Sequence, residues 1–255
     1  MLKTPLIALA REAGTHIMDV YLEQRNQFSL KKDGSYVTEA DRRAEKYILS
    51  NLLRLTPEIT IISEENSASH TIEVPERFWL VDPLDGTKEF LKKNGQGTFT
   101  VNIALIEHQN PVLGIIFLPA INRLFYGDID TGAWEITEDL EQLITASNVR
   151  GQKRCAVTSS SHIDVTTVKW LHNRGITQIK PLSSSIKFCA LAAGEADIYP
   201  RFNSTMEWDT AAGDAILRAA GGITTTLEFE PLSYGKAGYR NQGFIAWNKA
   251  LEPFK

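Results

Sequence analysis

The sequence has few cysteines, no excess of positive charge and no long uninterrupted apolar run. Its 255 residues include two cysteines, Cys155 and Cys189, which are too few for a disulfide framework and lack zinc-ligand spacing. The formal net charge is −4, and the sequence has no basic stripe that could neutralise the phosphates of a nucleic acid. The composition therefore argues against a nucleic-acid polymer as partner. We expect both cysteines to be buried thiols in a reducing compartment.

Several common catalytic motifs are also missing. The chain contains no G-x-x-x-x-G-K-[ST], no H-E-x-x-H, no G-x-S-x-G and no G-x-G-x-x-G after a strand. The apolar stretch near the start is interrupted by Arg11, Glu12 and Asp19, so it predicts neither a signal peptide nor a membrane span. Apolar residues at helical spacing predict instead an amphipathic helix in a soluble, cytoplasmic protein: Leu6, Ala10, Ala13, Ile17 and Tyr21.

The stretch D-P-L-D-G-T at 82–87 is the most informative part of the chain. It follows an apolar run, Phe78–Val81, that is typical of a buried strand. Two carboxylates, a carbonyl and a hydroxyl therefore gather at a strand end, and hard divalent cations prefer such oxygens. The alternative is a plain turn, because D-P and D-G are common turn formers. Metal binding is the better interpretation, since turns rarely follow a wholly apolar run with two acids.

Four further acids have ordinary structural explanations. Thr38 is a good N-cap for a helix reaching about residue 55, and Asp41 stands where a capping-box partner would be. Glu64 and Glu65 end a short strand, where acids are usually solvated. Asp209 heads a helix rich in small residues, where it can complement the helix dipole. From these positions alone, a structural role is the simpler interpretation for each.

The order of predicted elements divides the chain into two halves. The first half ends in an antiparallel meander and a short acidic link over residues 138–144, with predicted strands at 98–106, 112–118, 124–128 and 133–137. The second half alternates strands (155–158, 176–179, 196–199) with helices (164–173, 184–193, 208–220). Such alternation predicts a mostly parallel sheet covered on both faces.

Polar residues follow the strands of the second half, where ligands bind in such sheets. They are Ser159–His162, Ser183–Lys187 and Tyr199–Arg201. Taken singly, the serines are helix caps and the cations are solvated charges. Taken together, hydroxyls, helix starts and the cations Lys187 and Arg201 suit a phosphate or a ribose.

Two motifs carry a family resemblance that covers nearly the whole chain. D-P-L-D-G-T, followed in the same order by W-D-T-A-A-G at 208–213, resembles the two signatures of the inositol monophosphatase superfamily, which are metal-dependent, lithium-sensitive phosphomonoesterases. K-E-F at 88–90, S-S-S-H at 159–162 and S-S-x-K-F-C-x-L-A-x-G-x-A-D-x-Y-P-R at 184–201 are similar to the branch that hydrolyses 3′(2′),5′-bisphosphate nucleotides. The haloacid-dehalogenase motif D-x-D-G-T is the nearest rival, but here two residues separate the aspartates.

The resemblance implies an α/β fold, a layered α-β-α-β-α sandwich of the fructose-1,6-bisphosphatase/inositol monophosphatase type. It implies two or three Mg²⁺ per site, bound by Glu64, Asp82, the Leu84 carbonyl, Asp85 and Asp209. Glu64 and Thr87 would orient the attacking water, and Asp41 would support Thr87. The implied substrate contacts are Gly86, Thr87, Ser160, Ser161, His162, Ser184, Ser185, Lys187, Arg201 and Asp209.

The implied reaction is hydrolysis of the 3′-phosphate of adenosine 3′,5′-bisphosphate, in sulfur metabolism and nucleotide recycling. Phosphoadenylyl sulfate is an open alternative substrate, and inositol monophosphatase activity or a non-enzymatic nucleotide- or phosphoinositide-binding module is an alternative function. We expect residues 1–145 to carry the metal motif and residues 146–255 the nucleotide contacts and the last metal ligand. A monomer or homodimer is expected, and the resemblance allows peripheral association with the cytoplasmic face of the inner membrane.

Overall fold

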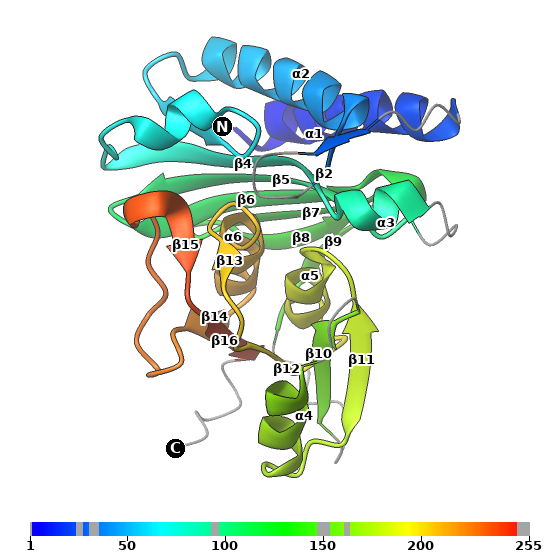
Figure 1. Ribbon diagram of the computed structural model, residues 1–255, viewed down its shortest axis with the longest axis vertical. Helices are drawn as coiled ribbons and strands as arrows, with labels where there is room; N and C mark the ends of the chain where they lie inside the picture. Colours follow the sequence, from blue (N-terminus) through cyan, green and yellow to red (C-terminus); the bar gives the residue numbers. More distant parts are fainter. Residues whose placement is uncertain are drawn as a thin grey trace.

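Two helices form the outer layer of the protein (Figure 1). The structure, a computed structural model, describes residues 2–23, 28–30, 36–92, 97–146, 154–160 and 164–248. Helix α1 (Lys3–Leu22) buries the predicted apolar stripe except for Tyr21, which is partly buried, and α2 (Glu39–Leu55) packs beside it. The capping box at the start of α2 is confirmed, because Thr38 and Asp41 each bond the other's backbone N–H.

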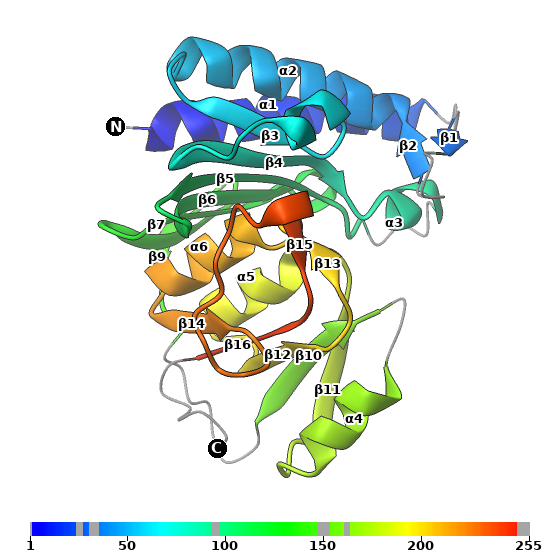
Figure 2. The same ribbon diagram turned by 60° about the vertical axis from the view of Figure 1, so that its left-hand side comes forward.

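The second layer is a seven-stranded sheet that α1 and α2 cover on one face (Figure 2). Its first two strands are parallel and the others form the predicted antiparallel meander. Short segments flank it: β1 (Phe28–Leu30), β2 (Tyr36–Thr38), η1 (Ser67–Thr71), α3 (Thr87–Lys92) and η2 (Pro119–Ile121). In spatial order the strands are β3 (Thr60–Ser63), β4 (Arg77–Asp85), β5 (Thr100–Glu107), β6 (Asn110–Leu118), β7 (Arg123–Asp128), β8 (Gly132–Ile136) and β9 (Glu141–Ile144).

The expected acidic link over 138–144 is wrong in its second part. A tight turn, closed by the Thr137 N–H to the Leu140 carbonyl at 2.8 Å, returns the chain against β8, and residues 141–144 form the edge strand β9. Only Ile144 of this strand is buried. Charged and polar side chains on an exposed edge strand hide the apolar alternation from which a strand is predicted.

Two helices fill the space between this sheet and a second one (Figure 2). They are α5 (Ile186–Ala192) and α6 (Ala211–Ala219). Helix α6 lies almost against the first sheet: a Cβ on Gly114 would stand 2.3 Å from the Ala212 carbonyl oxygen, and one on Gly127 2.5 Å from the Ile216 Cα. Glycine in β6 and β7 therefore allows the close packing that the small residues of α6 predict.

The second sheet has five strands, and α4 (Val165–His172) covers its outer face (Figure 1). Its spatial order is β11 (Gln178–Leu182), β10 (Cys155–Ser159), β12 (Ile198–Arg201), β16 (Phe244–Asn248) and β14 (Gly222–Thr225), and a small pair, β13 (Thr205–Met206) and β15 (Arg240–Asn241), lies nearby, with η3 (Ala237–Tyr239) just before β15.

The expectation of a mostly parallel sheet is only half right. β10 is parallel to both its neighbours, but β16 runs antiparallel to β12 and β14. A loop with no crossover helix joins β14 to β16, and such a connection favours antiparallel pairing. The layered α-β-α-β-α sandwich is confirmed (Figure 2). Of the described helices, none has the length and apolar character needed to cross a bilayer.

Candidate metal and phosphate site

Strand β4 carries the first acids of the site to its end. The strand is buried from Phe78 to Leu84, and Asp82, with 1% of its surface exposed, accepts the Leu84 N–H at 3.0 Å. The pairing with β5 shifts between Asp82 and Asp85, which marks a bulge, and such irregularities can re-aim side chains. Gly86 follows at φ 93°, a conformation that favours glycine.

Two other segments bring acids to the same point. Strand β3 is parallel to β4, and the Glu64 N–H donates to the Val81 carbonyl at 3.1 Å, so Glu64 lies beside Asp82. Asp209, just before α6, accepts the Met206 N–H at 3.0 Å and the hydroxyl of Thr205. Carboxylate oxygens of Glu64, Asp82 and Asp209 lie within 4.8 Å of one another. Oxygen ligands at such spacing can share a hard divalent cation.

The electrostatics of this cluster also suit a cation. Burial, and then the charges of Glu64, Asp85 and Asp209, raise the pKa of Asp82 well above its usual value. Burial, Asp85 and Glu64 raise the pKa of Asp209 to about 7, although the Thr205 hydroxyl and Arg201 act in the opposite direction. The cluster therefore holds more negative charge than its surroundings compensate, and a bound divalent cation would balance it.

Asp85 has partners from the second half of the chain. The Ser184 and Ser185 hydroxyls donate to its Oδ2 at 2.6 and 2.9 Å. The expected contact of these serines with substrate stays a prediction, because in this structure their hydroxyls are directed at Asp85. The Thr87 hydroxyl donates to the Leu84 carbonyl at 3.2 Å, which brings together two of the predicted site groups.

Asp41 is the N3 residue of the capping box at the start of α2, in which Thr38 is the N-cap. Its Oδ2 accepts the Thr38 N–H at 2.7 Å and the Thr38 hydroxyl at 2.6 Å. Its implied support of Thr87 stays a prediction. Ser160 lies just beyond the end of β10 and bonds Ser183 through its hydroxyl. Ser161 and His162 lie outside the described residues.

A cavity of about 280 Å³ adjoins the acids. Residues from both halves of the chain line it, among them Asp85, Gly86, Ser184, Ser185, Lys187, Arg201 and Asp209. Lys187 is buried, and its ammonium donates to the Leu182 carbonyl at 3.2 Å and the Ser184 carbonyl at 2.5 Å. Two of its three N–H groups are thus occupied by backbone.

Arg201 is the cation that links the cavities of the site. Burial tends to lower its pKa, but Tyr199 and the carboxylates of Asp209 and Asp85 raise it, so the guanidinium is charged. Its Nε and Nη2 donate to backbone carbonyls at 203 and 204, both at 3.3 Å. The residue lines the cavity beside the acids and also a second hollow.

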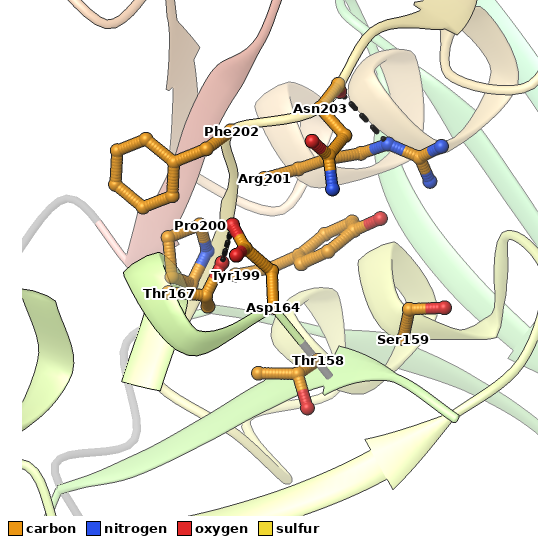
Figure 3. A pocket seen from close by; sticks show the side chains of 9 residues that line it. All are labelled: Thr158, Ser159, Asp164, Thr167, Tyr199, Pro200, Arg201, Phe202 and Asn203. Atoms are coloured by element: carbon orange, nitrogen blue, oxygen red, sulfur yellow. Dashed lines mark hydrogen bonds between the residues drawn. The ribbon is translucent and has the colours of Figure 1, made fainter. Parts of the chain in front are cut away.

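This second hollow lies at the ends of β10 and β12, beside the start of α4 (Figure 3). Figure 3 shows Tyr199 across it, with Asp164 and Thr167 on the α4 side. It shares Ser159, Tyr199 and Arg201 with the first cavity, and its full lining is Thr158, Ser159, Asp164, Thr167, Tyr199, Pro200, Arg201, Phe202 and Asn203.

Sequence reasoning missed several residues that contact the predicted ones. Thr205 bonds Asp209, while Thr100 and Asn102 of β5 bond Ser184 and Ser185. A signal for the last two was available, because Thr100 and Asn102 are polar residues at alternate positions of a strand that is otherwise apolar up to Ile106.

The layered sandwich, with clustered acids between its halves, defines a known class of fold. Residues 2–252 match the sequence profile of the inositol monophosphatase family. The chain therefore belongs to the inositol monophosphatase family.

Two relatives and one solved structure show where in this family its similarities lie. The chain is 41% identical to the 3′(2′),5′-bisphosphate nucleotidase CysQ of Escherichia coli K12, over 92% of this chain and 95% of the relative. It is 42% identical to the protein of the same name in Buchnera aphidicola, over 93% and 90%. The crystal structure of CysQ from Bacteroides thetaiotaomicron superposes with a TM-score of 0.83, at 36% identity, covering 95% of each chain.

Proposed function

We propose that the protein is a Mg²⁺-dependent 3′(2′),5′-bisphosphate nucleotidase that converts adenosine 3′,5′-bisphosphate to AMP and phosphate. This proposal rests on one observation: a cavity lined by Arg201 and Lys187 lies directly beside clustered carboxylates whose oxygens are within 4.8 Å of one another. The names of the relatives point to the same substrate class. Phosphoadenylyl sulfate, which carries a 3′-phosphate as well, fits the same arrangement.

The residues present fit Mg²⁺. Every proposed ligand offers oxygen, from Glu64, Asp82, Asp85, Asp209 and the carbonyl of Leu84. Burial and then the carboxylates of Asp85 and Glu64 raise the pKa of Asp209, and a bound cation would offset this crowding of negative charge. Bound Mg²⁺ supplies Lewis-acid stabilisation of the phosphoryl group and activation of a water molecule.

The chain's own groups orient the reaction. Glu64 is half-buried at the rim of the cluster, where its carboxylate would accept a proton from the attacking water. The Thr87 hydroxyl, fixed to the Leu84 carbonyl, would hold the same water in line with the ester bond. Asp41 would support Thr87 from the start of α2.

The cations select the substrate. The 5′-phosphate would lie on the Arg201 side of the first cavity, where charge-assisted hydrogen bonds give orientation as well as affinity. The base would enter the hollow beyond Arg201, next to Tyr199 and Pro200. Inositol 1-phosphate has no second phosphate to use Arg201, which disfavours the inositol monophosphatase alternative.

Activity is expected to require Mg²⁺. EDTA should abolish hydrolysis of adenosine 3′,5′-bisphosphate, excess Mg²⁺ should restore it, and Li⁺ at millimolar concentration should inhibit it, as the family resemblance implies. Phosphate release measured across a Mg²⁺ titration checks this. Full activity after exhaustive removal of metal would contradict the proposed function.

A further inference from the structure

Two buried polar residues of β5 lie opposite the aspartates at the end of β4. The register pairs Asp82 with Asn102 and Asp85 with Thr100. Thr100 and Asn102 have 0% and 1% of their surface exposed, and, two residues apart on a strand, they face the same side of the sheet. Apart from Asn102, all residues from 101 to 106 are apolar. Burying two polar groups among them costs free energy unless each is hydrogen-bonded.

Each of the two residues contacts one serine before α5. The Thr100 and Ser184 hydroxyl oxygens lie 2.6 Å apart, and Asn102 Nδ2 donates to the Ser185 hydroxyl at 2.8 Å. Both serines in turn donate to Asp85 Oδ2. Two short chains of hydrogen bonds therefore run from β5 through the serines to a single carboxylate oxygen.

The direction of these bonds follows from the donors available. The Asn102 amide nitrogen faces both Ser185 Oγ and, at 3.5 Å, Asp85 Oδ2; its oxygen in that place would be repelled by the carboxylate. Ser185 accepts from Asn102, so its own proton points to Asp85 Oδ2 or to the Asp209 carbonyl, 2.8 Å away. The Ser185 hydroxyl therefore lies between Asp85 and the backbone of Asp209, and its one proton is shared between these two acceptors.

The unused end of Asn102 strengthens the argument. Its Oδ1 is buried and has no hydrogen-bond partner among the residues that the structure describes. A buried acceptor without a partner lowers stability, and an apolar side chain at this position would avoid that cost. The contact of its amide group with Ser185 and Asp85 therefore accounts for asparagine better than packing does.

We propose that Thr100 and Asn102 are positioning residues that act on the metal site through Ser184 and Ser185. They hold Asp85 Oδ2, so that Asp85 presents its other oxygen to the cation in a fixed orientation. This inference rests on the proposed function, because it takes Mg²⁺ as the ligand. It assigns the two serine hydroxyls to Asp85 and not to a substrate phosphate. Mutation of a group that orients a metal ligand typically lowers metal affinity or activity by about 10–100-fold.

The test is the Mg²⁺ dissociation constant, measured by calorimetry without substrate. Thr100→Val, which removes a hydroxyl at nearly constant shape, and Asn102→Ala should each weaken Mg²⁺ binding about 10-fold or more. Thr56→Val is the matched control: Thr56 is buried and accepts the Trp79 indole N–H at 2.9 Å near the start of β4. This control should lose stability, seen in urea unfolding, and keep the wild-type dissociation constant.

A double variant tests the route of the effect. If Asn102 acts through the serine, Asn102→Ala combined with Ser185→Ala should bind Mg²⁺ no more weakly than Ser185→Ala alone. Additive losses, or Thr100→Val and Asn102→Ala proteins that bind Mg²⁺ like the wild type, would overturn the inference and leave the proposed function standing. A wild-type protein that binds no Mg²⁺ would overturn both.

Discussion

Asp82→Asn is expected to lower kcat about 10³-fold on every phosphate ester tested, while the metal-free protein becomes more stable. Asp82 is buried beside Glu64 and Asp209. A bound metal stabilises the charge of the transition state in such reactions by several kcal/mol, and that stabilisation would be lost with the ligand. Removing one charge from a crowded, buried cluster relieves repulsion, so activity and metal-free stability should change in opposite directions.

The pH dependence of stability follows from the same cluster. Native-state burial and neighbouring charges raise the pKa of Asp209 from 3.8 to about 7, and that of Asp82 rises too. Between pH 3.8 and about pH 7, the native state therefore binds more protons than the unfolded state. The stability of the metal-free protein should therefore fall as the pH rises through this window.

Thermal unfolding in EDTA measures this effect. At pH 8 the Asp82→Asn protein should melt about 3–6 °C above the wild type, and the difference should shrink towards pH 5. Saturating Mg²⁺ should reverse the order by stabilising the wild type more. Asp130→Asn, at an exposed turn, is the charge-matched control and should change neither kcat nor this pH profile. If the Asp82→Asn protein kept wild-type turnover, this result would show that Asp82 is not part of the metal site.

Arg201→Ala is expected to lower kcat/KM for adenosine 3′,5′-bisphosphate about 10–100-fold and to leave adenosine 3′-monophosphate nearly unchanged. A charge-assisted hydrogen bond to the remote phosphate is worth roughly 1.5–3 kcal/mol, and the second substrate has no such group. Arg201 lines the cavity beside Asp85 and Asp209, and its guanidinium donates to the backbone carbonyls at 203 and 204. Steady-state kinetics on the two nucleotides separates the two effects.

Lys187→Ala should behave differently from Arg201→Ala. Its ammonium supports the Leu182 and Ser184 carbonyls, and Ser184 contacts Asp85, so both nucleotides should lose activity, the bisphosphate more than the monophosphate. Lys180→Ala, at an exposed position of the edge strand β11 in the second sheet, serves as the cation control. Equal losses on both substrates for Arg201→Ala would mean that Arg201 serves the shared metal site, and the nucleotide assignment would then lose its support.

Local patterns allowed much of the fold to be predicted from the sequence. The apolar run before Asp82 predicted β4, Thr38 and Asp41 predicted the capped start of α2, and helical periodicity predicted α1. Each of these signals lies within a few residues of the element that it specifies. Strand β9 was not predicted because its pairing with β8 leaves an exposed, charged edge. The antiparallel strand β16 was not predicted because its pairing partners lie far along the chain.

The site shows the same division between local and distant information. The paired aspartates of D-P-L-D-G-T indicated a metal from their own spacing, whereas Glu64 and Asp209 became candidates only through the family resemblance. Thr205 stands only four residues before Asp209, which it contacts, but no motif marks it in the sequence. Thr100 and Asn102 reach the site by contacts between distant segments, and no local spacing shows such contacts. A polar residue within a largely apolar strand is the only trace that Thr100 and Asn102 leave in the sequence.

The most direct measurement is turnover of adenosine 3′,5′-bisphosphate and inositol 1-phosphate by the same purified protein in saturating Mg²⁺. The two substrates share the ester chemistry at the acids and differ at Arg201, so the ratio of their kcat/KM values isolates the proposed specificity. We predict at least a 10-fold preference for the nucleotide, because one charge-assisted contact to the second phosphate already supplies roughly that factor. Equal turnover, or a preference for inositol 1-phosphate, would contradict the account.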